Sequence, residues 1–220
     1  NQAGQLKLKQ PEKGVRVLIA YDARKGAQGF AQAAYEAVSA FRGITVDLAD
    51  GITTSPDAAF MSKDQYDVVV VITASHNPEN DNGIKVFTDG IVATDKFAKS
   101  IEVRANSSEG RAGYDILPFD ASKVNFVSAF DISSARKQRV FSNLLSLVSD
   151  YRQANPEAQM VVDMMGGAAA RYAPQFEALG IKVFGSEPMS ERQYTNRAGK
   201  LYSPNPTIAE NYGDEFDTFK

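Results

Sequence analysis

The chain has 220 residues, 43% apolar and 23% charged, an ordinary composition for a folded protein of one large or two modest domains. The net charge is −3, and neither a basic run nor an apolar run of ~18 residues occurs, so we expect neither nucleic acid nor a membrane as partner. The absence of Cys excludes disulfides, thiolate zinc sites and thiol nucleophiles, and it suits a reducing cytoplasm, where we expect the protein to reside.

The first half of the chain alternates predicted strands and helices. Residues 1–13 are polar and are expected to form an N-terminal extension. Apolar runs at 16–21, 44–48 and 67–73 predict three strands. Helices are predicted between them at 30–41 and 56–62, and the first has an apolar stripe formed by Phe30, Ala33, Ala34, Ala37, Val38 and Phe41. The unbroken Val/Ile run of the third strand predicts burial on both faces, as in a parallel sheet.

The second half repeats this alternation. A strand is predicted at 84–87, a helix at 95–105 and a loop at 106–120. A long helix is predicted from about residue 131 to the Asn155-Pro156 stop, with an apolar stripe formed by Val140, Phe141, Leu144, Leu145, Val148 and Tyr151. A strand at 160–163, a helix at 168–179 and a strand at 181–184 follow. We therefore predict two consecutive α/β domains with mixed, mainly parallel sheets flanked by helices, at 14–130 and 131–220.

The most informative segment is Thr73-Ala74-Ser75-His76-Asn77-Pro78, which contains the only histidine of the chain. It follows the third predicted strand, and ligand sites of open parallel sheets lie beyond the carboxyl ends of strands. The turn Asp81-Asn82-Gly83 then returns the chain to Lys85. The dipeptide Ser75-His76 alone is also compatible with an ordinary loop. A serine hydrolase is disfavoured because the chain has no Gly-x-Ser-x-Gly segment.

The serine segment, together with Asn82-Gly83-Ile84-Lys85, closely resembles the active-site segment of the α-D-phosphohexomutases. This family includes phosphoglucomutases, phosphomannomutases and phosphoglucosamine mutases. Shorter segments resemble the family in the same order: Ala20-Tyr21-Asp22-Ala23-Arg24, Gly51-Ile52-Thr53-Thr54-Ser55-Pro56, Asp163 with Gly166-Gly167, and Pro204-Asn205-Pro206-Thr207. The resemblance covers about residues 15–210 and implies the first two domains of such an enzyme.

The resemblance also implies the roles of the site residues. Ser75 is expected to carry a phosphoryl group and, through that phosphate, to supply one ligand of Mg²⁺. His76 and Lys85 are assigned to proton transfer or charge stabilisation, and Arg24 and Asn77 to binding of the phosphorylated group. Two alternatives stay open, a surface salt bridge for Arg24 and a structural role in the loop for His76. The implied substrate is a hexose phosphate and the implied intermediate a bound hexose 1,6-bisphosphate, whereas Asp22 is expected to order its loop.

The sequence also departs from the family. It contains no Asp-Gly-Asp-x-Asp-Arg metal loop, which the resemblance assigns to a third domain, so we expect domains three and four to be absent. We therefore interpret the chain as the N-terminal half of a mutase that interconverts hexose 1-phosphate and hexose 6-phosphate, and expect it to be a poor catalyst or inactive alone. The alternative is a non-catalytic phosphosugar-binding or interaction module with the same fold. The particular hexose and the oligomeric state stay open.

Overall fold

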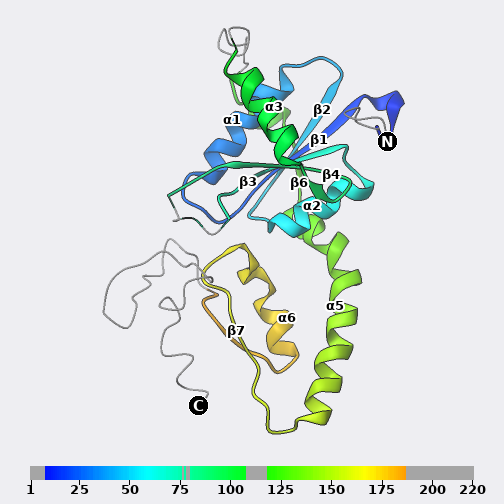
Figure 1. Ribbon diagram of the computed structural model, residues 1–220, viewed down its shortest axis with the longest axis vertical. Coiled ribbons are helices and arrows are strands. Elements are labelled where there is room, and N and C mark those ends of the chain that lie inside the picture. Colours follow the sequence, from blue (N-terminus) through cyan, green and yellow to red (C-terminus); the bar gives the residue numbers. More distant parts are fainter. Residues whose placement is uncertain (1–7, 76, 78–79, 108–117, 187–220) are drawn as a thin grey trace.

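The computed structural model describes residues 8–75, 77, 80–107 and 118–186, with the backbone alone for residues 135–141. The chain forms two successive groups of secondary structure (Figure 1). Within the described ranges, no helix is both long and apolar enough to span a bilayer.

A six-stranded sheet organises the first group. Its strands are β1 (Val15–Tyr21), β2 (Ile44–Ala49), β3 (Val68–Ile72), β4 (Ile84–Thr88), β5 (Ile91–Val92) and β6 (Asn125–Val127). Their order across the sheet is β5-β4-β3-β1-β2-β6. The pairs β1–β2, β1–β3 and β2–β6 are parallel, and β3–β4 and β4–β5 are antiparallel. This mixed, mostly parallel sheet with flanking helices confirms the predicted α/β class.

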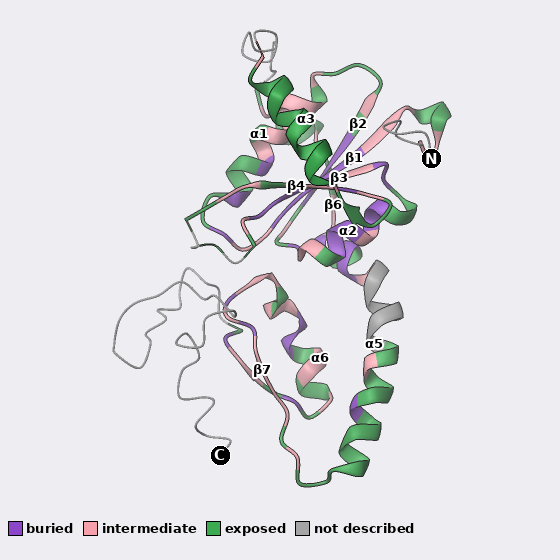
Figure 2. Ribbon diagram, in the orientation of Figure 1, coloured by how far each residue is buried: buried purple, intermediate pink, exposed green. Residues whose placement is uncertain are grey.

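Helices α1 (Ala27–Ser39) and α2 (Ser55–Asp64) cover opposite faces of the sheet. Side chains alternate across a strand, so neighbouring residues of β1 enter different cores. Leu18 belongs to the core that contains Ala58 of α2, whereas Ile19 belongs to the core that contains Ala31 of α1. Both faces of β1 are therefore buried (Figure 2).

The two crossover connections place a switch point between β1 and β3. The chain leaves β1 through α1 to reach β2 on one side, and then crosses through α2 to β3 on the other side. Ligands bind at such points in open α/β sheets because the loops diverge and leave a crevice. The N–H of Asp22 donates to the carbonyl oxygen of Ile72 at 3.1 Å, so the ends of the two strands are joined here.

The remaining helices of the first group lie at its periphery. They are the 3₁₀ turns η1 (Pro11–Lys13) and η2 (Ala121–Lys123) and the helix α3 (Asp95–Ala105). The side chain of Thr94 caps α3 by accepting from the N–H of Phe97. The helix 95–105 is thus confirmed, and none of its residues is buried.

The second group begins with a long helix. It comprises α5 (Ala129–Ala154), β7 (Val161–Asp163), the 3₁₀ helix η3 (Ala168–Tyr172), α6 (Ala173–Ala178) and β8 (Lys182–Phe184). Strands β7 and β8 pair in parallel. Ile132 in the first turns of α5 is fully buried in the core beneath α2, so this helix is anchored in the first group. Further along, α5 is largely exposed (Figure 2).

Several expected elements differ from the structure. Helix α1 begins three residues before Phe30, whose side chain is 56% exposed; Ala27 and Ala31 are its buried residues. Helix α5 begins at Ala129, and its Leu145 and Tyr151 are exposed. The helix expected at 168–179 is divided, because Pro174 lies in the first turn of α6 and cannot continue the preceding hydrogen-bonded turn.

Strands β5 and β6 were not predicted. Strand β6 pairs with β2 and so places residues 125–127 in the first sheet. The proposed division of the chain near residue 130 stays a prediction.

Candidate functional site

The serine loop, residues 73–77, leaves the end of β3 at the switch point. The N–H of Thr73 donates to the carbonyl oxygen of Gly83 at 3.0 Å, and the N–H of Ser75 donates to Oγ1 of Thr73 at 3.1 Å. Ser75 is exposed and has φ of 60°, a left-handed conformation that is unfavourable for residues other than glycine. Such strain persists only when neighbouring contacts hold it, and it is concentrated at functional sites.

Lys85 lies beside the serine, as the turn at 81–83 predicts. It belongs to β4, in register with Val71 of β3, and its Nζ lies 3.4 Å from Oγ of Ser75. The contact joins the only two predicted catalytic residues that the described ranges contain, since His76 lies outside them. A primary ammonium at this distance can stabilise negative charge that develops on, or is attached to, the serine oxygen.

Arg24 reaches the same loop from the end of β1. Its side chain is 5% exposed. The guanidinium donates to the carbonyl oxygens of Ser75 at 2.5 Å, Asn77 at 2.9 Å and Asp81 at 3.4 Å. Arg24 also pairs with Asp22, but this salt bridge is largely buried and does not lie on the surface. The planar guanidinium holds several N–H donors in a fixed geometry, so this one group can bind carbonyls on both sides of the turn.

Asp22 orders the loop after β1, as expected. Its Oδ1 accepts from the N–H of Arg24 at 3.1 Å, and its Oδ2 lies 3.3 Å from Nε of Arg24. A second connection comes from Asn82, whose Nδ2 donates to the carbonyl oxygen of Lys25 at 2.9 Å. The loops after β1 and β3 are thus held together by side chain–backbone hydrogen bonds from both directions.

Asn77 contributes its backbone to these contacts. Its N–H donates to the carbonyl oxygen of Ala74 at 3.1 Å, and its own carbonyl accepts from Arg24. The residue itself is exposed. The ligand-binding role assigned to Asn77 stays a prediction.

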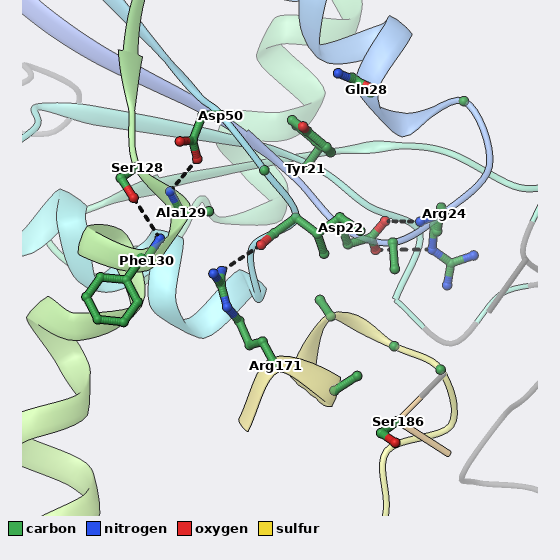
Figure 3. A pocket seen from close by; sticks show the side chains of 18 residues that line it. Tyr21, Asp22, Arg24, Gln28, Asp50, Ser128, Ala129, Phe130, Arg171 and Ser186 are labelled. Carbon is green, nitrogen blue, oxygen red and sulfur yellow. Dashed lines mark hydrogen bonds and ion pairs between the residues drawn. The ribbon is translucent and has the colours of Figure 1, made fainter. Parts of the chain in front are cut away.

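A cleft of about 890 Å³ opens next to this site (Figure 3). Its walls are the loop after β1, the loop after β2, the N-terminus of α5 and the turn before η3. Asp22 and Arg24 line it from the first group, and Arg171 lines it from the second. Burial, and secondarily the charge of Asp50, raises the pKa of Tyr21 in the same wall, so its hydroxyl keeps its proton.

Sequence reasoning missed the contacts between η3 and the loop before α2. The hydroxyl of Tyr172 donates to Oδ2 of Asp57, and Nη1 of Arg171 donates to the carbonyl oxygen of Ile52 at 2.7 Å. The contact between Thr54 and Asp57 could have been predicted from the sequence, because the two residues have the spacing of a helix cap and its partner in the first turn. The contact from Tyr172 could not, since that residue is 115 residues away from Asp57.

Similarity to known proteins indicates the family of the chain. The family described as "Phosphoglucomutase/phosphomannomutase, alpha/beta/alpha domain I" matches residues 2–112, just over half of the chain. A phosphoglucosamine mutase of Anaeromyxobacter sp. (strain Fw109-5) is 32% identical over 175 residues, which cover 76% of this chain and 35% of the relative. One from Solidesulfovibrio magneticus is 33% identical over 192 residues, covering 85% of this chain and 40% of the relative.

A solved structure shows the same fold. The crystal structure of pp63/parafusin from Paramecium, described as a phosphoglucomutase in an open form, superposes with a TM-score of 0.60 at 18% identity. The match covers 92% of this chain and 41% of that chain. The chain thus spans only about two fifths, or less, of the length of the proteins it matches. The family match, the sheet topology and the serine loop together show that the chain belongs to the α-D-phosphohexomutase family and represents its N-terminal part.

Proposed function

We propose that Ser75 is the phosphoryl carrier of a hexose-phosphate mutase and that this chain is the N-terminal part of the enzyme that bears it. The observation that carries the proposal is the 3.4 Å contact between Nζ of Lys85 and the exposed Oγ of Ser75. The contact lies at the carboxyl end of β3, next to the switch point. Family membership supports the same reaction class.

The proposed reaction is a pair of phosphoryl transfers. In the first, the bond between phosphorus and Oγ of Ser75 breaks while a hexose hydroxyl oxygen bonds to phosphorus, and the hydroxyl proton passes to a base. The product is a bound hexose 1,6-bisphosphate. After it reorients, the bond between its other phosphorus and the hexose oxygen breaks while Oγ of Ser75 bonds to that phosphorus. The base returns its proton to the hexose oxygen, and a hexose monophosphate leaves. Such transfers depend mainly on positioning and charge stabilisation, not on covalent chemistry by the protein.

Three side chains of this chain, those of Lys85, His76 and Arg24, have separate roles in the proposal. Lys85 faces the serine oxygen and stabilises charge on the transferring group, and His76 is the proposed proton carrier. Arg24 binds the carbonyls of the serine loop and fixes its conformation. The ligand-binding role assigned to Arg24 stays a prediction beside this positioning role.

Magnesium is the cofactor that family membership brings to the proposal. The described residues contain no group of three or more His, Cys, Asp or Glu side chains that could hold a metal ion. They do not fit a complete magnesium site, although a phosphate on Ser75 would supply one oxygen ligand. The family resemblance assigns the carboxylate ligands to a third domain. On that ground, this chain alone is proposed to be inactive or a poor catalyst.

Intact mass spectrometry of the full-length protein tests the carrier role. After incubation with glucose 1,6-bisphosphate and Mg²⁺, the wild type should gain about 80 Da for one phosphoryl group, located on Ser75 by fragmentation. Ser75→Ala should gain nothing, whereas Ser100→Ala, on the outer helix α3, should behave as the wild type. A gain that persists in Ser75→Ala would contradict the proposal.

A coupled assay tests the reaction itself. The full-length protein should interconvert hexose 1-phosphate and hexose 6-phosphate, and the 220-residue chain should not. If the full-length protein isomerises no hexose phosphate while Ser75 is intact, the non-catalytic module becomes the better explanation. Isomerisation by the 220-residue chain at the full-length rate would disprove the proposed inactivity.

A further inference from the structure

We propose that Arg171 and Tyr172, adjacent residues of η3, are positioning residues for Ser75. They act through the β2–α2 loop, defined as residues 50–57 from the end of β2 to the first turn of α2. The proposal deepens the function proposed above and rests on it for the meaning of Ser75. Its structural part concerns contacts alone and can be tested without phosphoryl transfer.

Tyr172 binds the start of α2 through a buried carboxylate. Asp57 has no exposed surface, and its Oδ2 accepts from the hydroxyl of Tyr172 and from Oγ1 of Thr54, the latter at 2.6 Å. The N–H of Asp57 donates back to Oγ1 of Thr54 at 3.2 Å. Removing one donor from a buried carboxylate is costly, because no water replaces it. The hydroxyl of Tyr172 is therefore a strong determinant of how the first turn of α2 is held.

Arg171 binds the other end of the β2–α2 loop. Its Nη1 donates to the carbonyl oxygen of Ile52 at 2.7 Å (Figure 3). The contact spans 119 residues of sequence and lies in the wall of the cleft. Two adjacent side chains of η3 thus hold residues 52 and 57 at once, which fixes both the position and the orientation of the loop.

The β2–α2 loop is in turn hydrogen-bonded to the end of β1. The N–H of Thr53 donates to the carbonyl oxygen of Tyr21 at 2.8 Å, and Thr53 is fully buried. Tyr21 is the last residue of β1 and directly precedes Asp22. A shift of Thr53 would therefore shift the backbone from which Asp22 and Arg24 project.

The last step leads to the serine. Asp22 binds the backbone N–H and the guanidinium of Arg24, and Arg24 donates to the carbonyl of Ser75. Ser75 has the left-handed φ that neighbouring contacts must maintain. A continuous series of hydrogen bonds thus connects η3 to Ser75, whose left-handed backbone conformation depends on its neighbours. When η3 is released, the serine loop should open more often, since loops of this kind have the lowest local stability.

Amide hydrogen exchange of the 220-residue chain tests the structural part. Tyr172→Phe removes only the hydroxyl, and Arg171→Gln removes the guanidinium from a partly exposed side chain. In each variant, exchange at residues 50–57 and 73–77 should rise at least about fivefold relative to the sheet, because a hydrogen bond that supports both loops is gone. Tyr66→Phe is the matched control, since Tyr66 is equally buried and its hydroxyl donates to another buried carboxylate, Asp47, at 2.7 Å. It should not raise exchange selectively in the serine loop.

Other outcomes would overturn the proposal. One is a rise confined to residues 50–57, which would show that η3 does not influence the serine loop. Another is a rise in the serine loop that Tyr66→Phe reproduces. If Tyr172→Phe proves too unstable to measure, Arg171→Gln decides alone, and an unchanged serine loop in it counts against the proposal.

Kinetics of the full-length protein give the functional readout. If the proposed function holds, Arg171→Gln should lower kcat about threefold or more with KM little changed, because a mispositioned carrier impairs the transfer step more than binding. An unchanged kcat together with a loosened serine loop would refute the functional part. Absence of mutase activity in the wild type would refute the proposed function and leave the exchange result intact.

Discussion

Nη2 of Arg24 donates to the carbonyl oxygen of Ser75 at 2.5 Å, although 51 positions separate the two residues. A buried guanidinium that binds three carbonyls and a carboxylate cannot be replaced by a single ammonium. We expect Arg24→Lys to lower the free energy of unfolding by about 2–4 kcal/mol, since carbonyls and Asp22 lose partners in a dry environment. Urea unfolding measures the free energy of unfolding of both proteins. Lys25→Ala, at the exposed neighbouring position, should change that free energy by under ~0.5 kcal/mol.

Lys85 allows a test of charge stabilisation at the serine oxygen. Lys85→Met retains most of the side-chain length but removes the cation from its place 3.4 Å from Oγ of Ser75. In the full-length protein, transfer of a phosphoryl group onto Ser75 should slow by about 10²-fold, the usual order for one charged group in a transfer site. Rapid-quench mass spectrometry measures the rate. Lys99→Met removes an exposed cation that pairs with Glu102 and should leave the rate unchanged; equal slowing in both variants would argue against a local role.

Two glycines give opposite expectations for stability. A Cβ at Gly83 would lie 3.2 Å from the carbonyl oxygen of Thr73, at the point where the serine loop begins. Gly83→Ala should therefore destabilise the chain by about 1 kcal/mol. A Cβ at Gly29 in α1 would meet nothing within 4 Å, so Gly29→Ala should stabilise the helix by about 0.5 kcal/mol. Denaturant unfolding should give a lower free energy of unfolding than the wild type for Gly83→Ala and a higher one for Gly29→Ala.

Tyr66 should make stability fall in alkaline solution. Burial, then the hydrogen bond from its hydroxyl to Asp47 and the charge of that carboxylate, raises the pKa of Tyr66 well above its usual value. A raised pKa means that the folded chain holds the proton more tightly, so the contribution is fully present below pH about 10 and is lost as pH rises toward the folded value.

Chemical denaturation between pH 8 and 11 checks this, with those limits set around the ordinary tyrosine pKa of about 10. Tyr66→Phe should be less stable at pH 8, because Asp47 loses a donor, but its stability should decline less steeply above pH 10. Parallel curves for the two proteins would show that Tyr66 does not cause the decline.

Sequence alone predicted the parts of this fold that depend on local patterns. The Val/Ile run of β3 and the apolar run of β1 each give a strand whose residues are buried or half-buried, and the Asn155-Pro156 stop ends α5 as expected. Strand β6 was missed because three residues are too few for a periodic signal. It is held by pairing with β2 and by the Nδ2 of Asn125, which donates to the buried Asp47 at 2.7 Å.

The apolar stripe of α1 shows a different failure. Phe30 has the right spacing yet is exposed, Phe41 lies beyond the end of the helix at Ser39, and small alanines occupy the buried face. A helix that packs closely on a sheet favours small residues, and spacing alone cannot tell which of two overlapping stripes faces inward. In the site, the approach of Lys85 to Ser75 followed from the turn between them. The contacts of Arg24 with three carbonyls, and of Tyr172 with Asp57, depend on tertiary structure that no local pattern records.

Helix α5 follows β6 after a single residue, Ser128, and its first turns are fixed in the core of the six-stranded sheet. At 26 residues it is about 39 Å long and forms a stiff lever arm. A rotation of only about 10° at Ala129 would sweep its far end through roughly 7 Å, given the rise of 1.5 Å per residue. A small shift in the packing beneath α2 would therefore cause a larger displacement at the far end of α5. Residues such as Ile132 thus determine the position of the distant strands β7 and β8 as well as the stability of their own core.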